Sequence, residues 1–170
     1  MRVSPSIDDI DERAELIRSG TKWKKIEMNL RIISELGVVI IPTITVSAMN
    51  VFQLPEVIDR LIEIGVIRKK NNWQNFEINI VENPAMFHIS ILPDAVRQDV
   101  YTRLEKYIED YKNKYKMDIK QQFLFLFEHL KKSWDEVSAL KFKKFTSSID
   151  QIRHENTLDV IPELRCILND

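Results

Sequence analysis

The chain has 170 residues, 44% of them hydrophobic, and a formal net charge of −1, so it can bury a core of its own. This near-neutral charge, with lysines spread along the chain, offers no basic surface, and we expect no nucleic-acid partner. No apolar run approaches the roughly 18 residues that span a bilayer, and no apolar signal core is visible. We therefore expect a cytoplasmic protein with no membrane partner.

The first part of the chain alternates predicted strands with predicted helices. Residues 38–46 are apolar on both faces, which is typical of a buried strand in a parallel sheet. Helical stretches precede and follow this segment, and a glycine ends each of them, which is where helices commonly stop. The expected strands are 3–7, 38–46 and 73–81, the expected helices end at Gly20, Gly37 and Gly65, and residues 88–92 are expected to be extended. This order predicts an α/β fold with a parallel sheet or barrel.

The second part of the chain is predicted to be helical. Apolar residues recur with a helical period from Val96 to Tyr115, and further helices are expected at 119–132 and 134–154. The run Phe123–Phe127 is apolar all round, so we expect its helix to be well buried. The change of pattern near Pro93 predicts two parts: residues 1–92 with the βα pattern, and a helical extension over residues 93–170.

Few residues suggest chemistry on spacing alone. The only cysteine, Cys166, cannot form a multi-cysteine zinc or iron–sulfur site by itself, and three glycines cannot build a phosphate-binding loop. The histidines have no metal-ligand spacing, and structural or surface roles are expected for them. The acidic group near residue 10 is either a helix start or a cluster for acid–base or metal chemistry. It consists of Asp8, Asp9, Asp11 and Glu12.

Several segments resemble, in chain order, parts of radical S-adenosylmethionine (SAM) enzymes. Ser6–Trp23 resembles the stretch after the fourth barrel strand, and Ile41–Ile58 resembles the fifth strand and its exit. Ile91–Val100 is similar to the opening of the helix beyond the sixth strand. Phe145–Leu164 resembles the closing segment of the subgroup with a twitch domain. Together these segments are distributed across nearly the whole chain.

The resemblance implies a partial (βα) barrel, the last strands of a radical SAM-type barrel, followed by a C-terminal helical region. SAM would bind at the carboxyl ends of the strands, where parallel sheets place their ligands. In the family, the residues at the positions of Ser6 and Arg18 contact the methionine carboxylate or the ribose, and a guanidinium suits a carboxylate. The implied cofactor-binding residues are Ser6, Asp8, Arg18, Thr45, Ser47 and Asn50, with Glu82 and Asn83 as further candidates.

The chain departs from the family in the residues that would bind an iron–sulfur cluster. Family members cleave SAM with a [4Fe–4S] cluster held by three cysteines after the first barrel strand, and this chain has none of them. Asp9 also stands where a glycine is usual. We therefore expect a fragment or truncated relative of an enzyme that acts on a peptide or small metabolite. As this chain alone it would not be catalytically competent, no catalytic or metal-binding residue is assigned, and SAM binding would be weak or absent.

The resemblance also bears on partners. Half of a parallel barrel would leave an open edge and an uncovered apolar face. We expect this edge to pair with a second copy, with a separate N-terminal half, or within a longer protein. The alternative is a non-enzymatic α/β interaction module that docks a protein partner through its open sheet edge or its helices.

Overall fold

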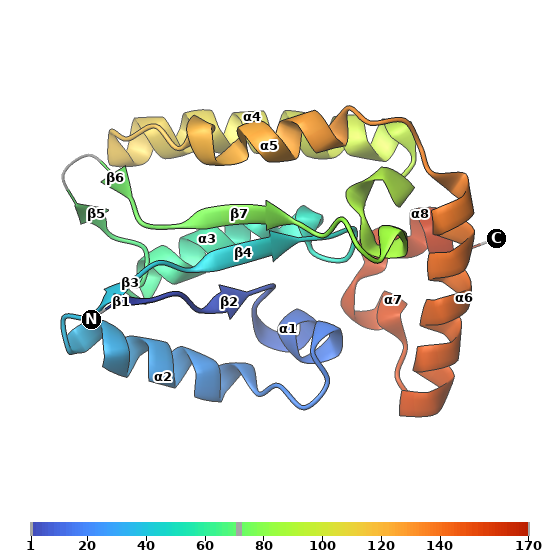
Figure 1. The fold of residues 1–170 in the computed structure, drawn as a ribbon, viewed down its shortest axis with the longest axis horizontal. Helices are drawn as coiled ribbons and strands as arrows, with labels where there is room; N and C mark the ends of the chain where they lie inside the picture. The colour runs from blue at the N-terminus through green and yellow to red at the C-terminus, as the bar shows by residue number, and fades with distance from the viewer. Residues whose placement is uncertain (1, 71–72, 170) are drawn as a thin grey trace.

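The computed structural model describes residues 2–70 and 73–169 and shows a mixed α/β protein. Its centre is a parallel sheet in the order β2–β4–β7, formed by Ser6–Ile7, Thr43–Val46 and Glu77–Ile80 (Figure 1). The described strands do not form a closed barrel. The shorter strands are β1 (Arg2–Val3) in parallel with β3 (Val39–Ile40), and β5 (Lys69–Lys70) antiparallel to β6 (Trp73–Gln74).

Helices surround the sheet on several sides. In Figure 1, α3 lies behind the sheet, α2 runs along one side, α4 and α5 along the other, and α6 crosses the carboxyl end. The α-helices are α1 (Asp11–Ile17), α2 (Trp23–Glu35), α3 (Leu54–Glu63), α4 (Asp94–Tyr115), α5 (Lys120–Leu130), α6 (Glu136–Arg153), α7 (Thr157–Val160) and α8 (Arg165–Leu168). Short 3-10 turns are η1 (Val51–Gln53), η2 (Ala85–Phe87), η3 (Ile89–Ile91) and η4 (Pro162–Leu164). No helix within the described ranges is both long enough and apolar enough to cross a membrane.

The predicted order of strands and helices is confirmed, with differences in detail. Gly20, Gly37 and Gly65 follow the predicted helices with φ values of +84°, +72° and +73°, a conformation that glycine adopts without steric cost. The strand expected at 38–46 is divided at Pro42 into β3 and β4. The prediction of an extended segment at 88–92 is wrong, because the chain there forms η3.

The two faces of the sheet differ in polarity. Ile44 and Val46 are fully buried on one face, while Thr43 and Thr45 on the other are only half-buried. The register aligns Ser6, Thr43 and Glu77 in one row and Thr45 with Asn79 in the next, so the open face carries polar side chains. The expectations that residues 38–46 are apolar on both faces, and that the open face is apolar, are therefore wrong.

One hydrophobic core joins both predicted parts of the chain. The fully buried side chains include Ile44 and Leu61 from the first part, and Phe123 and Phe142 from the second. The boundary predicted near residue 93 stays a prediction. The helix with the phenylalanine run is not buried all round, because Phe125 is 52% exposed on the outer side of α5.

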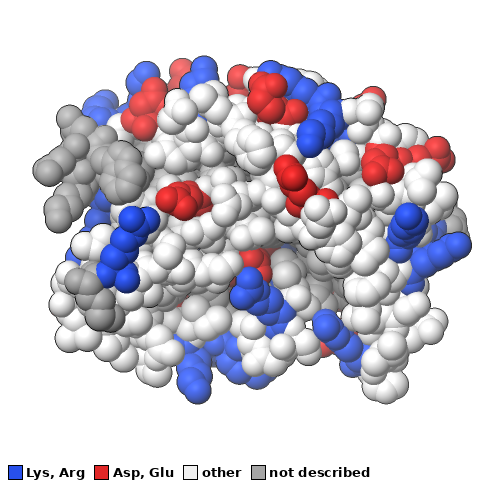
Figure 2. Space-filling model, viewed as in Figure 1, with Lys and Arg blue, Asp and Glu red and all other residues white. Residues whose placement is uncertain are grey.

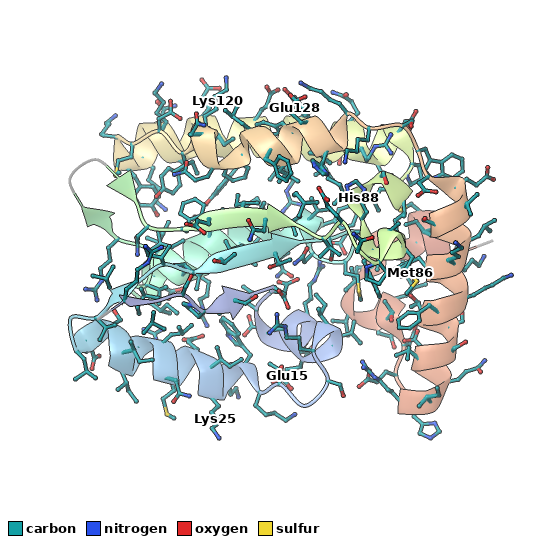
Figure 3. The ribbon with its side chains drawn as sticks, viewed as in Figure 1. Glu15, Lys25, Met86, His88, Lys120 and Glu128 are labelled. Atoms are coloured by element: carbon teal, nitrogen blue, oxygen red, sulfur yellow. The ribbon has the colours of Figure 1, made fainter. Side chains whose placement is uncertain are left out.

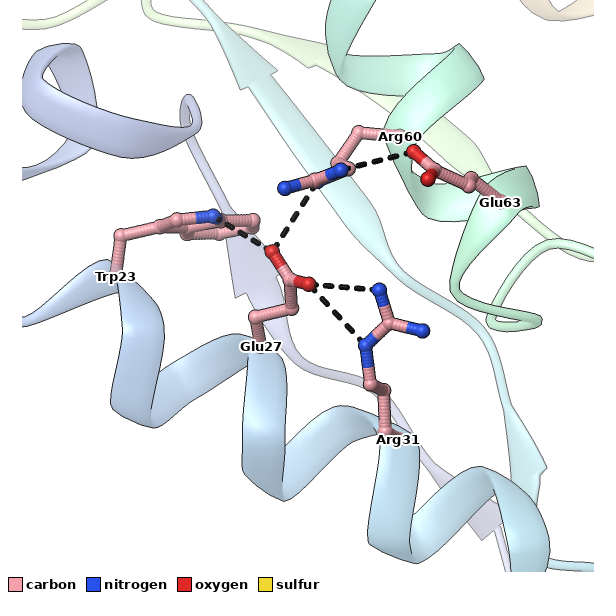
Figure 4. A network of polar contacts seen from close by, with 5 residues as sticks. All are labelled: Trp23, Glu27, Arg31, Arg60 and Glu63. Atoms are coloured by element: carbon pink, nitrogen blue, oxygen red, sulfur yellow. Dashed lines mark hydrogen bonds and ion pairs between the residues drawn. The ribbon is translucent and has the colours of Figure 1, made fainter.

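An ionic network fixes α2 against α3 (Figure 4). One Glu27 oxygen accepts hydrogen bonds from the Trp23 indole and from Arg60, both at 3.1 Å, and the other accepts from Arg31 at 2.8 and 3.1 Å. Arg60 also binds Glu63 at 2.9 Å. Burial acts to raise the pKa of Glu27, but the two guanidinium groups outweigh it and lower the pKa. The network therefore holds a charged carboxylate at the helix junction.

Candidate functional site

A cavity of about 300 Å³ opens where the parallel strands end. Loops that leave parallel strands at their carboxyl ends commonly bind ligands, because those ends meet at one edge of the sheet. Figure 2 shows a hollow near the middle of this side of the molecule, with one acidic and one basic group at its rim and mostly uncharged atoms around it. The cavity is lined by Asp8, Ile17, Arg18, Thr45, Ser47, Met49, Asn50, Val81 and Phe87.

Arg18 is the cationic group of this cavity. It follows the last turn of α1, and its backbone N–H donates to the carbonyl of Ala14 at 3.0 Å. Its Nε donates to the Asp8 carboxylate, and its Nη2 donates to Ser6 Oγ at 3.2 Å. The Arg18 side chain is 53% exposed. A guanidinium has five N–H donors, so Asp8 and Ser6 orient the group and leave other donors for an anionic ligand.

Asn50 holds the strand ends together. Its Nδ2 donates to the backbone carbonyl of Asp8 at 2.5 Å and to that of Thr45 at 2.9 Å. Asp8 follows β2, and Thr45 belongs to β4. Its Oδ1 accepts from the backbone N–H of Ser47 at 2.7 Å and from the Ser47 hydroxyl at 3.3 Å. An amide side chain has two donors and two acceptor positions, and all of them are used here. Asn50 therefore shapes the cavity and does not offer hydrogen bonds to a ligand.

The predicted cofactor-binding residues come together at this cavity. All of them line the cavity except Ser6, which binds the lining residue Arg18. Met49, Val81 and Phe87 supply the apolar part of the lining, which the sequence analysis did not identify. The further candidates Glu82 and Asn83 do not line it. A larger hollow of about 700 Å³ lies between α4 and α5, but its lining consists mainly of exposed charged side chains.

The acidic group at residues 8–12 does not converge on one point. Asp8 lines the cavity, Asp11 and Glu12 line a separate hollow of about 480 Å³, and Asp9 is buried. Burial raises the pKa of Asp9 to about 7, although the Ile10 amide, which donates to it at 2.8 Å, acts in the opposite direction. Across the described ranges, no group of three or more His, Cys, Asp or Glu side chains is placed to hold a metal ion.

The C-terminal segments hold α1, and through it Arg18. Arg13 on α1 binds both carboxylate oxygens of Glu163, at 2.8 and 2.9 Å. Arg153, at the end of α6, donates to the carbonyl of Leu16 at 3.2 Å. These contacts join residues that are well over a hundred positions apart. Periodicity along the sequence cannot reveal such pairs.

A buried chain of histidines lies beside the carboxyl end of β7 and was missed by sequence reasoning. His88 accepts the backbone N–H of Ser90 at 3.0 Å through Nδ1, so its neutral ring carries the proton on Nε2. This Nε2 lies 2.7 Å from Nδ1 of His129, whose Nε2 lies 3.8 Å from Glu82. Figure 3 shows His88 between the end of β7 and α5. The contact joins η3 to α5 and is internal, so it serves packing.

Compared with protein-family models, curated proteins and solved structures, the chain matches none of them. The cavity, with a guanidinium, a carboxylate and an apolar wall, fits a zwitterionic nucleoside such as SAM. The residues do not fit an iron–sulfur cluster, since Cys166 is the only cysteine and its thiol donates to the carbonyl of Glu163 at 3.2 Å.

Proposed function

We propose that this chain is the SAM-binding part of a radical SAM-type protein, and that β2, β4 and β7 are the last strands of a partial (βα) barrel. The observation that carries the proposal is the ion pair of Arg18 and Asp8 inside a cavity at the carboxyl ends of those strands. Neighbouring opposite charges suit the amino-acid end of SAM, with its carboxylate on Arg18 and its ammonium on Asp8.

The rest of the cavity suits the nucleoside end of the ligand. Val81, Met49 and Phe87 offer an apolar wall against which a purine can pack, and Thr45 offers a hydroxyl. Ser47 and Asn50 act as positioning residues, because their side chains already bond to each other. Binding would be weak, because the open face of the sheet leaves a ligand partly in water.

The proposal assigns no catalytic step to this chain. The 170 residues contain one cysteine, so three cluster cysteines would have to be supplied by another segment or chain. With such a cluster, SAM supplies the radical chemistry that would act on a peptide or small metabolite. The residues described here would only bind and orient SAM.

The test is a titration of the isotope-labelled chain with SAM, followed by amide NMR shifts. We expect shifts at residues 8, 18, 45 and 81 and a dissociation constant of about 1 mM, equivalent to roughly −4 kcal/mol. Arg18→Ala should weaken binding about tenfold or more, because a hydrogen bond to a charged group is lost.

The matched control is Arg103→Ala. Arg103 is 47% exposed and paired with Glu56, so it resembles Arg18 in exposure and pairing but lies on α4. It should leave binding unchanged. The proposal is wrong if SAM moves no cavity resonance at about 5 mM, several times the expected dissociation constant. It is also wrong if the two arginine variants bind SAM equally.

A further inference from the structure

An apolar stripe runs along the outer face of α2. Met28, Ile32 and Leu36 are 54%, 49% and 73% exposed, and Val39 in the following strand is 45% exposed. Residues four apart lie on the same face of a helix, so these side chains form one continuous row. The opposite face of α2, with Trp23 and Leu30, is buried against the molecule.

The carboxyl end of α2 carries a charge that its own dipole disfavours. Lys22, Lys24 and Lys25 lie at the amino end, where the Glu15 carboxylate already accepts from the Trp23 amide at 3.1 Å and from Lys22 at 3.0 Å. Glu35 lies at the carboxyl end, where a helix dipole favours a cation, so Glu35 costs stability in a single chain. In Figure 3, Lys25 points away from the body of the molecule. An antiparallel neighbour would bring the lysines of its own amino end towards Glu35 and compensate this cost.

We propose that α2 pairs with α2 of a second copy of this chain, antiparallel, about a two-fold axis at Ile32. An isologous contact places the same surface on both partners, so Ile32 meets Ile32 and Met28 meets Leu36 of the other copy. Glu35 of one helix then faces Asn29 of the other, and Lys25 of that helix lies about 6 Å further along the axis, within reach of Glu35 through its long side chain. A parallel pair would instead set lysines against lysines.

The contact is small, so the dimer is weak. A few half-exposed side chains per copy fall short of the roughly 1,200 Å² of a standard stable interface. We expect a dissociation constant on the order of 100 μM. This pairing uses a helix face that points away from the sheet, so it is independent of the proposed SAM site and of any pairing at the sheet edge.

Sedimentation equilibrium of the whole chain from about 10 μM to about 1 mM brackets this dissociation constant. The mass should rise from one chain towards two. Ile32→Glu should keep the chain monomeric throughout, whereas Ile152→Glu should dimerise like the wild type. Ile152 is the matched control, since it is 74% exposed on α6. A single-chain mass for the wild type at every concentration, or equal behaviour of the two variants, overturns the inference.

Cysteine cross-linking tests the orientation. In a Cys166→Ala background, Ile32→Cys should form a disulfide-linked dimer, because a residue on the axis faces its own copy. Met28→Cys alone should not, because the rise of 1.5 Å per residue separates the two positions by about 12 Å. A mixture of Met28→Cys and Leu36→Cys chains should cross-link. Efficient cross-linking of Met28→Cys alone would show a parallel pair and overturn the inference.

Charge exchange gives a third readout. Glu35→Lys should weaken the dimer about two- to fivefold, the usual range for an exposed ion pair. Adding Lys25→Glu to that variant should restore the pairing. Failure of the double variant to recover would show that the charges do not set the orientation.

Discussion

The buried histidine chain makes the stability of the protein depend on pH. His88 is 6% exposed, and both ring nitrogens have partners: Ser90 on one side and His129 on the other. Burial lowers the pKa of His88 from 6.5 to about 4, and the positive charges of Lys132 and His129 act in the same direction. Protonation would place a second proton where the Ser90 amide already donates, so acid breaks the contact.

The sign of the effect follows from the pKa. The unfolded chain binds a proton at His88 below about pH 6.5, whereas the folded chain does so only near pH 4. Stability from this group is therefore complete above pH 6.5 and is lost as the pH falls towards 4. A pH of 5 is about 1.5 units below the pKa of the unfolded histidine, and each unit is worth about 1.4 kcal/mol of stability. The expected loss from His88 between pH 7 and pH 5 is about 2 kcal/mol.

Other charged groups around His88 and His129 affect stability over the same pH range. Burial and Lys132, whose ammonium lies 3.1 Å from Nδ1 of His129, lower the pKa of His129 as well. Glu82 acts to raise the pKa of both histidines, and Asp135 acts to raise that of His88. The two imidazoles therefore change stability in the same direction. Asp9 acts in the opposite direction, because burial raises its pKa to about 7 and the folded carboxyl takes up a proton as the pH falls, so the difference between wild type and a His88 variant isolates the histidine.

Urea unfolding at pH 7 and pH 5 measures the effect in wild type and His88→Gln. The glutamine amide can accept from Ser90 and donate to His129 without titrating, so the loss between the two pH values should shrink by about 2 kcal/mol. His154→Asn is the control, because His154 is exposed at φ +54°, which asparagine tolerates. An equal loss in wild type and His88→Gln would refute the reasoning.

Four further substitutions test the packing by urea unfolding at pH 7. Glu27→Gln should cost about 1.5–3 kcal/mol, since it removes charge-assisted bonds between α2 and α3; no change would show that the network contributes nothing. Arg97→Met should cost more than 2 kcal/mol, because it removes the guanidinium donors of the Leu92 and Leu130 carbonyls and leaves Ser90 only the Asp135 amide, and a neutral result would contradict this role. Phe142→Ala should cost about 3–5 kcal/mol and Phe145→Ala clearly less, because Phe142 is fully buried and Phe145 is 41% exposed.

Local patterns determined the order of the elements. Gly20, Gly37 and Gly65 ended the helices as predicted, because only a residue without a side chain takes a positive φ freely. The extended segments at 3–7, 38–46 and 73–81 were predicted from their apolar or alternating residues, although each is divided into two short strands. These signals lie within a few neighbouring residues, so the sequence carries them in full.

The candidate site was partly predictable. The resemblance predicted that Asp8, Arg18 and Thr45 bind one ligand, and Asp8 and Thr45 come together because the carboxyl ends of parallel strands meet at one edge. The role of Asn50 did not follow, because it depends on carbonyls of two different strands. The apolar wall that includes Phe87 depends on how the turn after β7 folds back.

Only the tertiary structure decided which side chains are buried and paired. Phe125 belongs to an apolar run but is exposed, because it lies on the side of α5 that faces away from the rest of the molecule. His88 and His129 are 41 residues apart and meet only because η3 packs against α5. The sequence by itself determined most of the strands and helices, since local periodicity decides them, but not the 3-10 turn at Ile89–Ile91. Burial, pKa values and the contents of the cavity depend on contacts between distant segments, and only the fold brings those segments together.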